Sequence, residues 1–94
     1  MIYKITFLED ALKEWKKLPE DLKKRFKSKL SERMKEPRVK SSALHGMRDC
    51  YKIKFRAIGY RLVYKVYDDR LVIQIVAVGK RDKNIVYKRA KDRV

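Results

Sequence analysis

Residues 50–81 read CYKIKFRAIGYRLVYKVYDDRLVIQIVAVGKR, and this stretch decides the fold. Apolar and basic residues alternate from Tyr51 to Phe55, and the alternation resumes from Tyr60 to Val66. A period of two residues is typical of strands that bury one face. A slip of one residue in their pairing would turn the whole apolar set outward, so the pattern also predicts the register.

The predicted register brings two cations together. It buries three facing pairs on the core side: Phe55 with Tyr60, Ile53 with Leu62, and Tyr51 with Tyr64. On the other face it places Lys54 directly opposite Arg61. Like charges at that separation oppose strand pairing. We therefore hypothesise that an anion normally sits between Lys54 and Arg61.

A third strand of this meander is predicted from Leu71 to Val78, after a tight turn at Asp68-Asp69. It is apolar on both faces, which is usual for a strand in the middle of a sheet. A two-residue turn sets up the pairs Val66–Leu71, Tyr64–Ile73 and Leu62–Ile75. The exit of this strand, Gly79-Lys80-Arg81, would then lie at the same edge of the sheet as Lys54 and Arg61.

The N-terminal part of the chain predicts one strand and two helices. The segment from Ile2 to Phe7 alternates, and helical spacing follows in Leu8, Ala11, Leu12, Trp15 and Leu18. Pro19 ends this helix or opens the next one, whose apolar stripe is Leu22, Phe26, Leu30 and Met34. Pro37 stops the second helix. Its basic face is either a solvated surface or a face that lies along nucleic-acid phosphates.

The remaining elements complete the predicted architecture. Residues 38–47 predict a loop with a short strand near Leu44, and Asn84 is placed to cap a last helix. The order is therefore β-α-α-β-β-β-α in a single domain, residues 1–94. This order indicates an α+β fold, a mainly antiparallel sheet with a helical hairpin packed on one face. The other face would be open to a ligand and carries Lys52, Lys54, Arg61 and Lys65.

Charge and composition narrow the function. The chain has 27 Lys and Arg residues against 12 acidic ones, a formal net charge of +15. Such an imbalance favours a polyanionic partner: nucleic acid, an acidic protein or an acidic membrane surface. With one histidine and one cysteine, we expect no zinc site of the usual kind, no intrachain disulfide, and a reducing cytoplasm. Neither a signal peptide nor a membrane-spanning segment is predicted.

The predicted sheet edge suits phosphodiester chemistry. Strand register brings Lys54, Arg61 and Arg81 together, Lys52 lies one pleat away, and Tyr87 is placed to fold back over them. Prepositioned cations stabilise the negative charge that gathers on phosphorus oxygens in the transition state. In RNA the internal 2′-hydroxyl can act as nucleophile, so neither a metal nor a protein nucleophile is required, and we expect no cofactor. The alternative is that the strands of a very basic protein simply display basic residues.

Four segments of the chain resemble the RelE toxins of bacterial toxin–antitoxin pairs. They are ALKEWKKL (11–18), LHGMRDCYKIKFR (44–56), GYRLVYKV (59–66) and VAVGKRDKNIVY (76–87). The similarity extends over nearly the whole chain without apparent gaps. It implies a RelE-like, microbial-RNase-type fold and a ribosome-dependent endoribonuclease. Proteins of this family cleave messenger RNA in the ribosomal A site by attack of the substrate 2′-hydroxyl, which inhibits translation.

The resemblance also implies roles for individual residues. Lys52 and Lys54 match the strand lysines that orient the phosphate, and Arg61 matches the arginine that binds it. Arg81 matches the arginine assigned as acid or charge stabiliser, and Tyr87 matches the base. Where relatives commonly have an arginine that helps to hold RNA, this chain has His45. The further residues predicted to bind RNA or the ribosome are Arg56, Lys65 and Lys80.

Partners follow from the same resemblance. It implies an acidic, RelB-like antitoxin that wraps the toxin and displaces its last helix together with Tyr87. The ribosome would be the second partner, through ribosomal RNA and A-site messenger RNA. Operator DNA would be contacted only through the antitoxin complex, and no membrane partner is expected.

Two other functions stay open at this point. A ParE-like inhibitor of DNA gyrase would share the fold without needing nuclease residues. The joint presence of Lys52, Lys54, Arg61, Arg81 and Tyr87 favours the nuclease over this alternative. A non-catalytic basic module that binds RNA or DNA would instead show steeply salt-dependent binding without cleavage.

Overall fold

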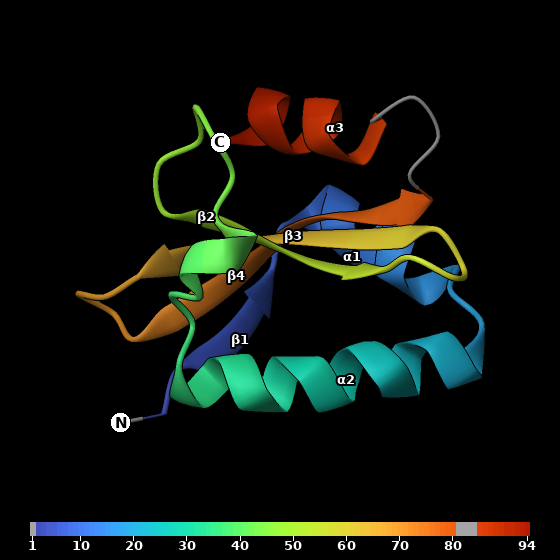
Figure 1. Cartoon of the computed structure of the whole chain (residues 1–94), viewed down its shortest axis with the longest axis horizontal. Coiled ribbons are helices and arrows are strands. Elements are labelled where there is room, and N and C mark those ends of the chain that lie inside the picture. Colours follow the sequence, from blue (N-terminus) through green and yellow to red (C-terminus); the bar gives the residue numbers. More distant parts are fainter. Residues whose placement is uncertain (1, 81–84) are drawn as a thin grey trace.

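The chain forms the predicted sequence of elements around one mixed sheet. A computed structural model describes residues 2–80 and 85–94. The elements are β1 (Lys4–Phe7), α1 (Glu9–Lys16), α2 (Glu20–Lys35), a 3₁₀ turn (Lys40–Ser42), β2 (Cys50–Phe55), β3 (Tyr60–Tyr67), β4 (Val72–Lys80) and α3 (Ile85–Arg93). The α+β class and the β-α-α-β-β-β-α order are confirmed. Figure 1 shows the sheet between α3 on one side and α2 on the other.

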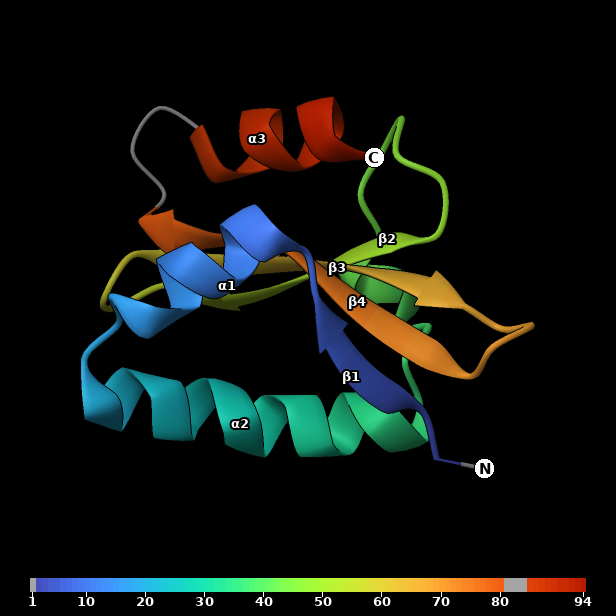
Figure 2. The same ribbon diagram turned by 180° about the vertical axis from the view of Figure 1, so that it is seen from behind.

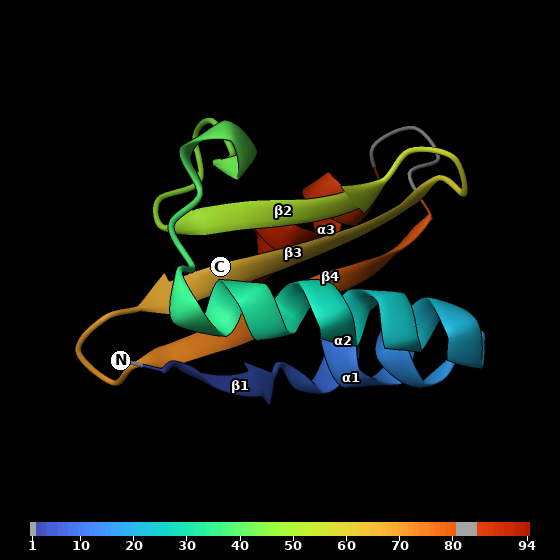
Figure 3. The same ribbon diagram turned by 60° about the horizontal axis from the view of Figure 1, so that its bottom comes forward.

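The strands lie in the order β1-β4-β3-β2, so β4 is central. β1 runs parallel to β4, whereas β2–β3 and β3–β4 are antiparallel. A central position explains why β4 is apolar on both faces: α2 covers one face and α3 the other (Figure 3). β2, with its alternating pattern, is one of the two edge strands, and β1 is the other.

The register of β2 against β3 agrees with the prediction at every pair. Phe55 faces Tyr60, Ile53 faces Leu62, Tyr51 faces Tyr64, and Lys54 faces Arg61. The alternation that sets this register is satisfied on the core side, where Ile53 and Leu62 are buried.

The predicted register of β3 against β4 is wrong. Val66 pairs with Ile73, Tyr64 with Ile75, and Leu62 with Val78. One cause is the connection, which spans residues 68–71 instead of two residues and ends with Leu71 at a positive φ of 52°. The other cause is an irregularity between Val63 and Tyr64, where β4 holds one extra residue, Val76. The longer connection shifts the pairing by two residues, and the extra residue in β4 shifts it by one more beyond Tyr64.

The sheet buries two apolar clusters, one on each face. The larger lies between the sheet and the helices α1 and α2, with Trp15, Phe26, Leu62 and Ile75 among its members. The smaller lies under α3 and consists of Cys50, Val63, Val76, Ala77, Val86 and Ala90. The prediction of one open face is therefore wrong over β3 and β4, because their apolar residues on that face need a cover.

The loop before β2 is held by an ionic network instead of a strand. The short strand predicted near Leu44 is reduced to an isolated bridge between Ala43 and Tyr51. Arg38 donates to Asp49 at 2.9 Å and to Asp68 at 2.8 Å, and the Tyr3 hydroxyl donates to Asp68 at 2.6 Å. Arg38 thereby fastens this loop to the β3–β4 connection.

The described residues contain no helix that is both long enough and apolar enough to cross a membrane. The predicted cap residue Asn84 lies outside the described residues, while α3 itself is formed and buries Val86 and Ala90.

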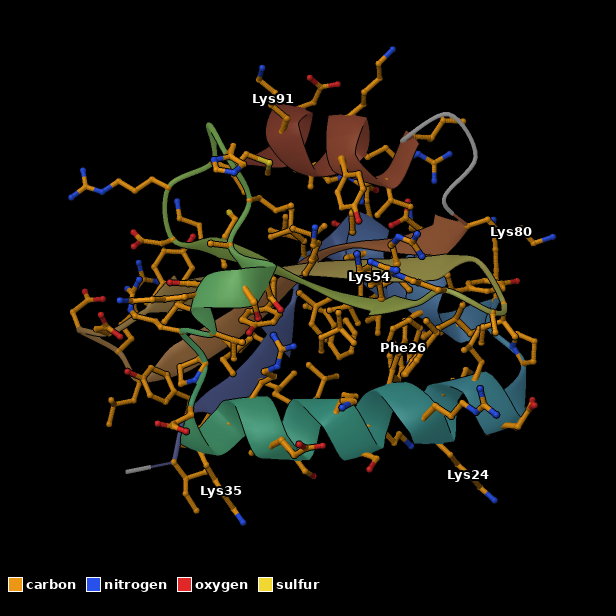
Figure 4. All side chains as sticks on the ribbon, viewed as in Figure 1. Lys24, Phe26, Lys35, Lys54, Lys80 and Lys91 are labelled. Atoms are coloured by element: carbon orange, nitrogen blue, oxygen red, sulfur yellow. The ribbon has the colours of Figure 1, made fainter. Side chains whose placement is uncertain are left out.

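Phe26 is the centre of the larger cluster and provides a test of the packing. Its side chain is fully buried, 4.9 Å from Phe55 and 6.2 Å from Trp15 between ring centroids, and lies between α2 and the sheet (Figure 4). Phe26→Ala is expected to lower the free energy of unfolding by about 3–5 kcal/mol. Lys24→Ala, an exposed control on the same helix, should change it by less than about 0.5 kcal/mol. Urea denaturation measures both, and similar losses would contradict the assigned core.

Candidate nucleic-acid interface

The like-charged pair predicted from the sequence is present and lies at one end of the sheet. Lys54 of β2 pairs with Arg61 of β3, and Arg61 in turn pairs with Gly79 of β4. The Lys54 side chain is exposed at the middle of the view in Figure 4, whereas Arg61 is only 7% exposed. The Nη1 atom of Arg61 donates to the carbonyl of Tyr60 at 3.2 Å. Among the described residues, no carboxylate lies within 4 Å of either cation.

The pKa of Lys54 records the repulsion at this site. The nearby charges of Arg56 and Lys52, together with a small loss of hydration and the charge of Arg61, hold the pKa of Lys54 below its ordinary value. A bound phosphate would reverse the effect of these charges, because it favours the protonated ammonium. Binding of an anion at this site would therefore relieve the repulsion among its cations.

The neighbouring positions of β4 leave room for such an anion. Gly79 faces Arg61 and has no side chain to cover it. A Cβ atom at Gly79 would lie 3.4 Å from Cγ2 of Val86, so α3 approaches the strand closely here. Lys80 is exposed at the end of β4 (Figure 4) and pairs with Tyr60. The predicted arrival of β4 at this edge is confirmed as far as Lys80. Arg81 lies outside the described residues.

Tyr87 lies in the first turn of α3, which covers this face of the sheet. Its side chain is half-buried and packs against the smaller apolar cluster, which contains Val63 and Ala77. Val63 pairs with Lys52, so the apolar residues beneath α3 and the basic residues lie side by side on the same face of the sheet. The fold thus brings Tyr87 back over the sheet face that carries Lys52, Lys54 and Arg61.

One carboxylate fastens α3 to the sheet. Glu14 of α1 accepts two bonds from Arg93, Nη1 to Oε1 at 2.9 Å and Nη2 to Oε2 at 3.0 Å. It also accepts from Arg89 at 3.0 Å and from the backbone N–H of Val78 at 3.1 Å. Arg93 donates further to the carbonyl of Val76 at 2.9 Å. Figure 2 shows α1 beside β4, where β1 has already ended. Glu14 and Arg93 therefore satisfy strand groups that β1 does not reach.

The surroundings of Glu14 favour its charged form. Burial by itself would raise its pKa, but the bonds from Arg93 and Val78 and the charges of Arg93 and Arg89 outweigh burial and lower it. The pKa of Arg93 is raised, mainly by its bond to Glu14. Both shifts describe an ion pair that stays charged at neutral pH.

The other residues predicted to bind RNA are spread over two ends of the sheet. Arg56 is exposed in the β2–β3 loop, next to Lys54. His45 is exposed in a turn whose neighbours Leu44 and Met47 pack against the smaller cluster, so this loop lies on the α3 side. Lys65 pairs with Cys50, four positions from Arg61, and stacks 5.2 Å over the ring of Tyr67. The structure therefore does not bring Lys65 to the Lys54–Arg61 pair.

Sequence reasoning missed Glu14, although a signal was present. Glu14 stands three residues after Ala11 and four before Leu18, so it lies beside the buried stripe of α1. A carboxylate beside a buried stripe is costly to bury unless a cation or a hydrogen-bond donor pairs with it. The prediction for α3 considered only its apolar residues and its overall basic character. Within residues 2–80 and 85–94 no group of three or more His, Cys, Asp or Glu side chains is placed to hold a metal ion.

Known proteins similar to this chain agree on one family. A family model described as "ParE toxin of type II toxin-antitoxin system, parDE" matches residues 5–85. The chain is 49% identical over 94 residues to a RelE-like toxin protein of Escherichia coli, covering 100% of the chain and 99% of that protein. It is 47% identical, with the same coverage, to the mRNA interferase toxin RelE of Escherichia coli strain K12.

Solved structures agree as well. A free arginine-to-alanine double mutant of Escherichia coli RelE superimposes with a TM-score of 0.92 at 46% identity, covering 100% of this chain and 99% of that one. The same mutant bound to a peptide of the antitoxin RelB gives a TM-score of 0.83 at 46% identity, with the same coverage. The toxin of the intact Escherichia coli RelBE complex gives 0.81 at 49% identity, covering 83% of this chain and 95% of that one.

The fastening of α3 can be tested by removing the charge of Glu14. Because the folded pKa of Glu14 is lowered, its contribution to stability is complete above the unfolded pKa of about 4.3 and is lost as the pH falls through the folded pKa. Glu14→Gln is expected to lower the free energy of unfolding by about 1–3 kcal/mol at pH 7 and by less at pH 3. It should also speed hydrogen exchange of the α3 amides.

The matched control is Glu20→Gln, since Glu20 is 81% exposed in its pair with Lys23. Its effect on unfolding should be below about 1 kcal/mol, with no change in the exchange of α3. Equal exchange rates for α3 in the Glu14 variant and the unsubstituted chain would show that this carboxylate does not hold the helix.

Proposed function

This chain belongs to the RelE/ParE family of toxins from type II toxin–antitoxin systems, and we propose that it is an endoribonuclease that cleaves messenger RNA on the ribosome. The relatives named mRNA interferase are 47% identical to it over the whole chain. Its action would block translation, and its substrate places that action in the cytoplasm.

The observation that supports this function best is the Lys54–Arg61 pair. Burial of the core side chains fixes the register, and the register sets the two cations face to face. Arg61 is buried there without a described carboxylate partner, which is costly unless an anion completes the site. A scissile phosphate would complete the site. It carries a negative charge, and its oxygens can accept hydrogen bonds from both cations.

In the proposed reaction the 2′-hydroxyl of the RNA attacks the adjacent phosphorus. Tyr87, acting through its deprotonated phenolate oxygen, takes the proton of this hydroxyl, and the bond to the 5′-oxygen of the next nucleotide breaks, leaving a cyclic phosphate. Lys52, Lys54 and Arg61 stabilise the charge that gathers on the phosphoryl oxygens. Arg81 stabilises the leaving oxygen or gives it a proton. The ribosome supplies the geometry of the substrate, since the protein offers no strong acid–base pair of its own.

The proposed partners follow from the relatives and from charge. Escherichia coli RelE is solved with the antitoxin RelB and with a RelB peptide. An acidic RelB-like antitoxin would match the net charge of +15 of this chain. Such an antitoxin would inhibit by displacing α3, which carries Tyr87 away from the cations. Contact with operator DNA would be made by the antitoxin in the complex.

A second candidate is inhibition of DNA gyrase, and the name of the matching family model favours it. A gyrase inhibitor does not require a phosphate site. It would therefore leave the Lys54–Arg61 pair and the position of Tyr87 without a role. We rank it second for this reason.

The proposal is tested by translation in a cell-free system in which the ends of the message are mapped. The unsubstituted chain is expected to produce cuts in phase with codons. Arg61→Ala and Arg81→Ala should each slow cleavage by about 10²–10³-fold, as for loss of a donor to a developing oxyanion. Tyr87→Phe should slow it by about 10²–10⁴-fold while ribosome binding changes little.

Lys24→Ala is the matched control, because it removes a cation from the outer side of α2 without touching the sheet (Figure 4). It should cleave at the rate of the unsubstituted chain. Intact message together with blocked supercoiling by gyrase would replace the first candidate by the second. Equal losses of cleavage and ribosome binding in Tyr87→Phe would refute its role as base.

A further inference from the structure

A second basic site lies on the other side of the edge strand β2. A hollow of about 350 Å³ separates α2 from β2 and the 3₁₀ turn. It is lined by Lys29, Arg33, Ser41, Ser42, Lys52, Ile53, Lys54 and Arg56. We call this hollow the α2–β2 groove. Figure 3 shows β2 as an outer strand of the sheet, next to β3.

The positive charge of the groove is not neutralised by acidic residues in its walls. Among the residues that the structure describes, its lining holds five Lys or Arg residues, two serines and no carboxylate. Lys29 has a weak surface contact with Glu32 at 3.9 Å, in which the two side chains are 49% and 66% exposed. Among the described residues, the other four cations have no carboxylate within 4 Å.

Arg33 is held in the wall of the groove by neutral acceptors. Its Nη1 donates to the hydroxyl of Tyr64 at 2.8 Å and to the carbonyl of Lys52 at 3.3 Å. Its Nη2 donates to Oγ of Ser42 at 3.3 Å, and the guanidinium lies 5.8 Å from the ring centre of Tyr64. These bonds fix the orientation of Arg33 but leave its charge uncompensated. A fixed, uncompensated guanidinium beside serine hydroxyls is typical of a phosphate-binding wall.

The groove and the candidate cleavage site share two residues. Lys52 and Lys54 line the groove and also stand on the sheet face that carries Arg61. They are two residues apart on one strand, about 6.6 Å along it at 3.3 Å per residue. A strand of RNA whose scissile phosphate lies at Lys54 and Arg61 can therefore pass over the β2 edge without leaving a basic surface.

We propose that the α2–β2 groove binds a phosphodiester of RNA next to the bond that is cut. The inference rests on the proposed function, because it assigns a second phosphate to the same enzyme. An acidic peptide is the competing occupant. It is disfavoured because Ile53 is the only large apolar residue among the described residues of the lining, and peptide sites are anchored by apolar pockets. The RNA can be the message itself or ribosomal RNA, since both present the same phosphodiester.

Binding is tested with Lys29→Gln and its matched control Lys24→Gln, which make the same change of charge on the same helix. The probe is ribosomes carrying a defined message whose scissile nucleotide is 2′-deoxy, so that it is bound but not cut. Lys29→Gln is expected to weaken association by roughly three- to tenfold and to reduce the slope of log K against log salt by about 0.7. Lys24→Gln should leave both unchanged. On normal message, Lys29→Gln should raise KM and keep kcat, since Lys29 does not touch the cut phosphate.

The source of the RNA is identified by a photoreactive residue. Ser41, which is exposed in the groove, is replaced by benzoylphenylalanine, and the cross-linked nucleotides are mapped after irradiation on the same ribosomes. Cross-links to the message beside the cut, or to ribosomal RNA, support the proposal and name the source. Cross-links to protein alone, or equal binding by the Lys29 and Lys24 variants while cleavage is intact, overturn it. Failure of the unsubstituted chain to cut any message is a failure of the proposed function instead.

Discussion

The pairing of β2 with β3 is the constraint on which the structure depends. The alternating apolar side chains of both strands, such as Ile53 and Leu62, point into the larger cluster, and they do so in only one register, because a slip of one residue would turn them to the other face. That register places Lys54 opposite Arg61. The free energy of burying the core thus holds two cations together against their repulsion. The basic site is a consequence of packing, and packing keeps it in place before any anion arrives, which is what preorganised electrostatic stabilisation requires.

The helix that covers this site is attached differently from the rest of the fold. α3 buries Val86 and Ala90 against a small cluster, and the charges of Glu14, Arg89 and Arg93 add the remaining attachment. A small apolar contact and a single carboxylate are easier to replace than the larger core. An acidic partner offers carboxylates to the same arginines. Displacement of α3 by the proposed antitoxin would therefore need no change in the sheet, and the cations of β2 and β3 would stay where they are.

Strand register was predicted correctly where apolar and polar residues alternate without interruption. It was predicted wrongly where a loop or an extra residue interrupts the alternation. The β2–β3 pairs follow from a period of two that is unbroken on both strands. The β3–β4 pairs do not, because the four-residue connection with Leu71 at positive φ and the extra residue Val76 carry no clear local signal. The arrival of Gly79 and Lys80 beside Arg61 was nevertheless predicted correctly. Its cause is topology, since an antiparallel return brings the end of β4 to the start of β3 whatever the small shifts in between.

The sequence by itself determined the class of fold, the order of the elements, the basic character of the protein and the juxtaposition of Lys54 with Arg61. All of these depend on patterns that are local or that repeat with the period of a strand or helix. Only the tertiary structure decided that α3 covers the second face, that Glu14 holds it there, and that Arg33 turns the β2 edge into a groove. These features join residues as far apart in the chain as Glu14 and Arg93. No local period encodes such a contact; it arises when the sheet brings the edge of β4 and the ends of α1 and α3 to one place.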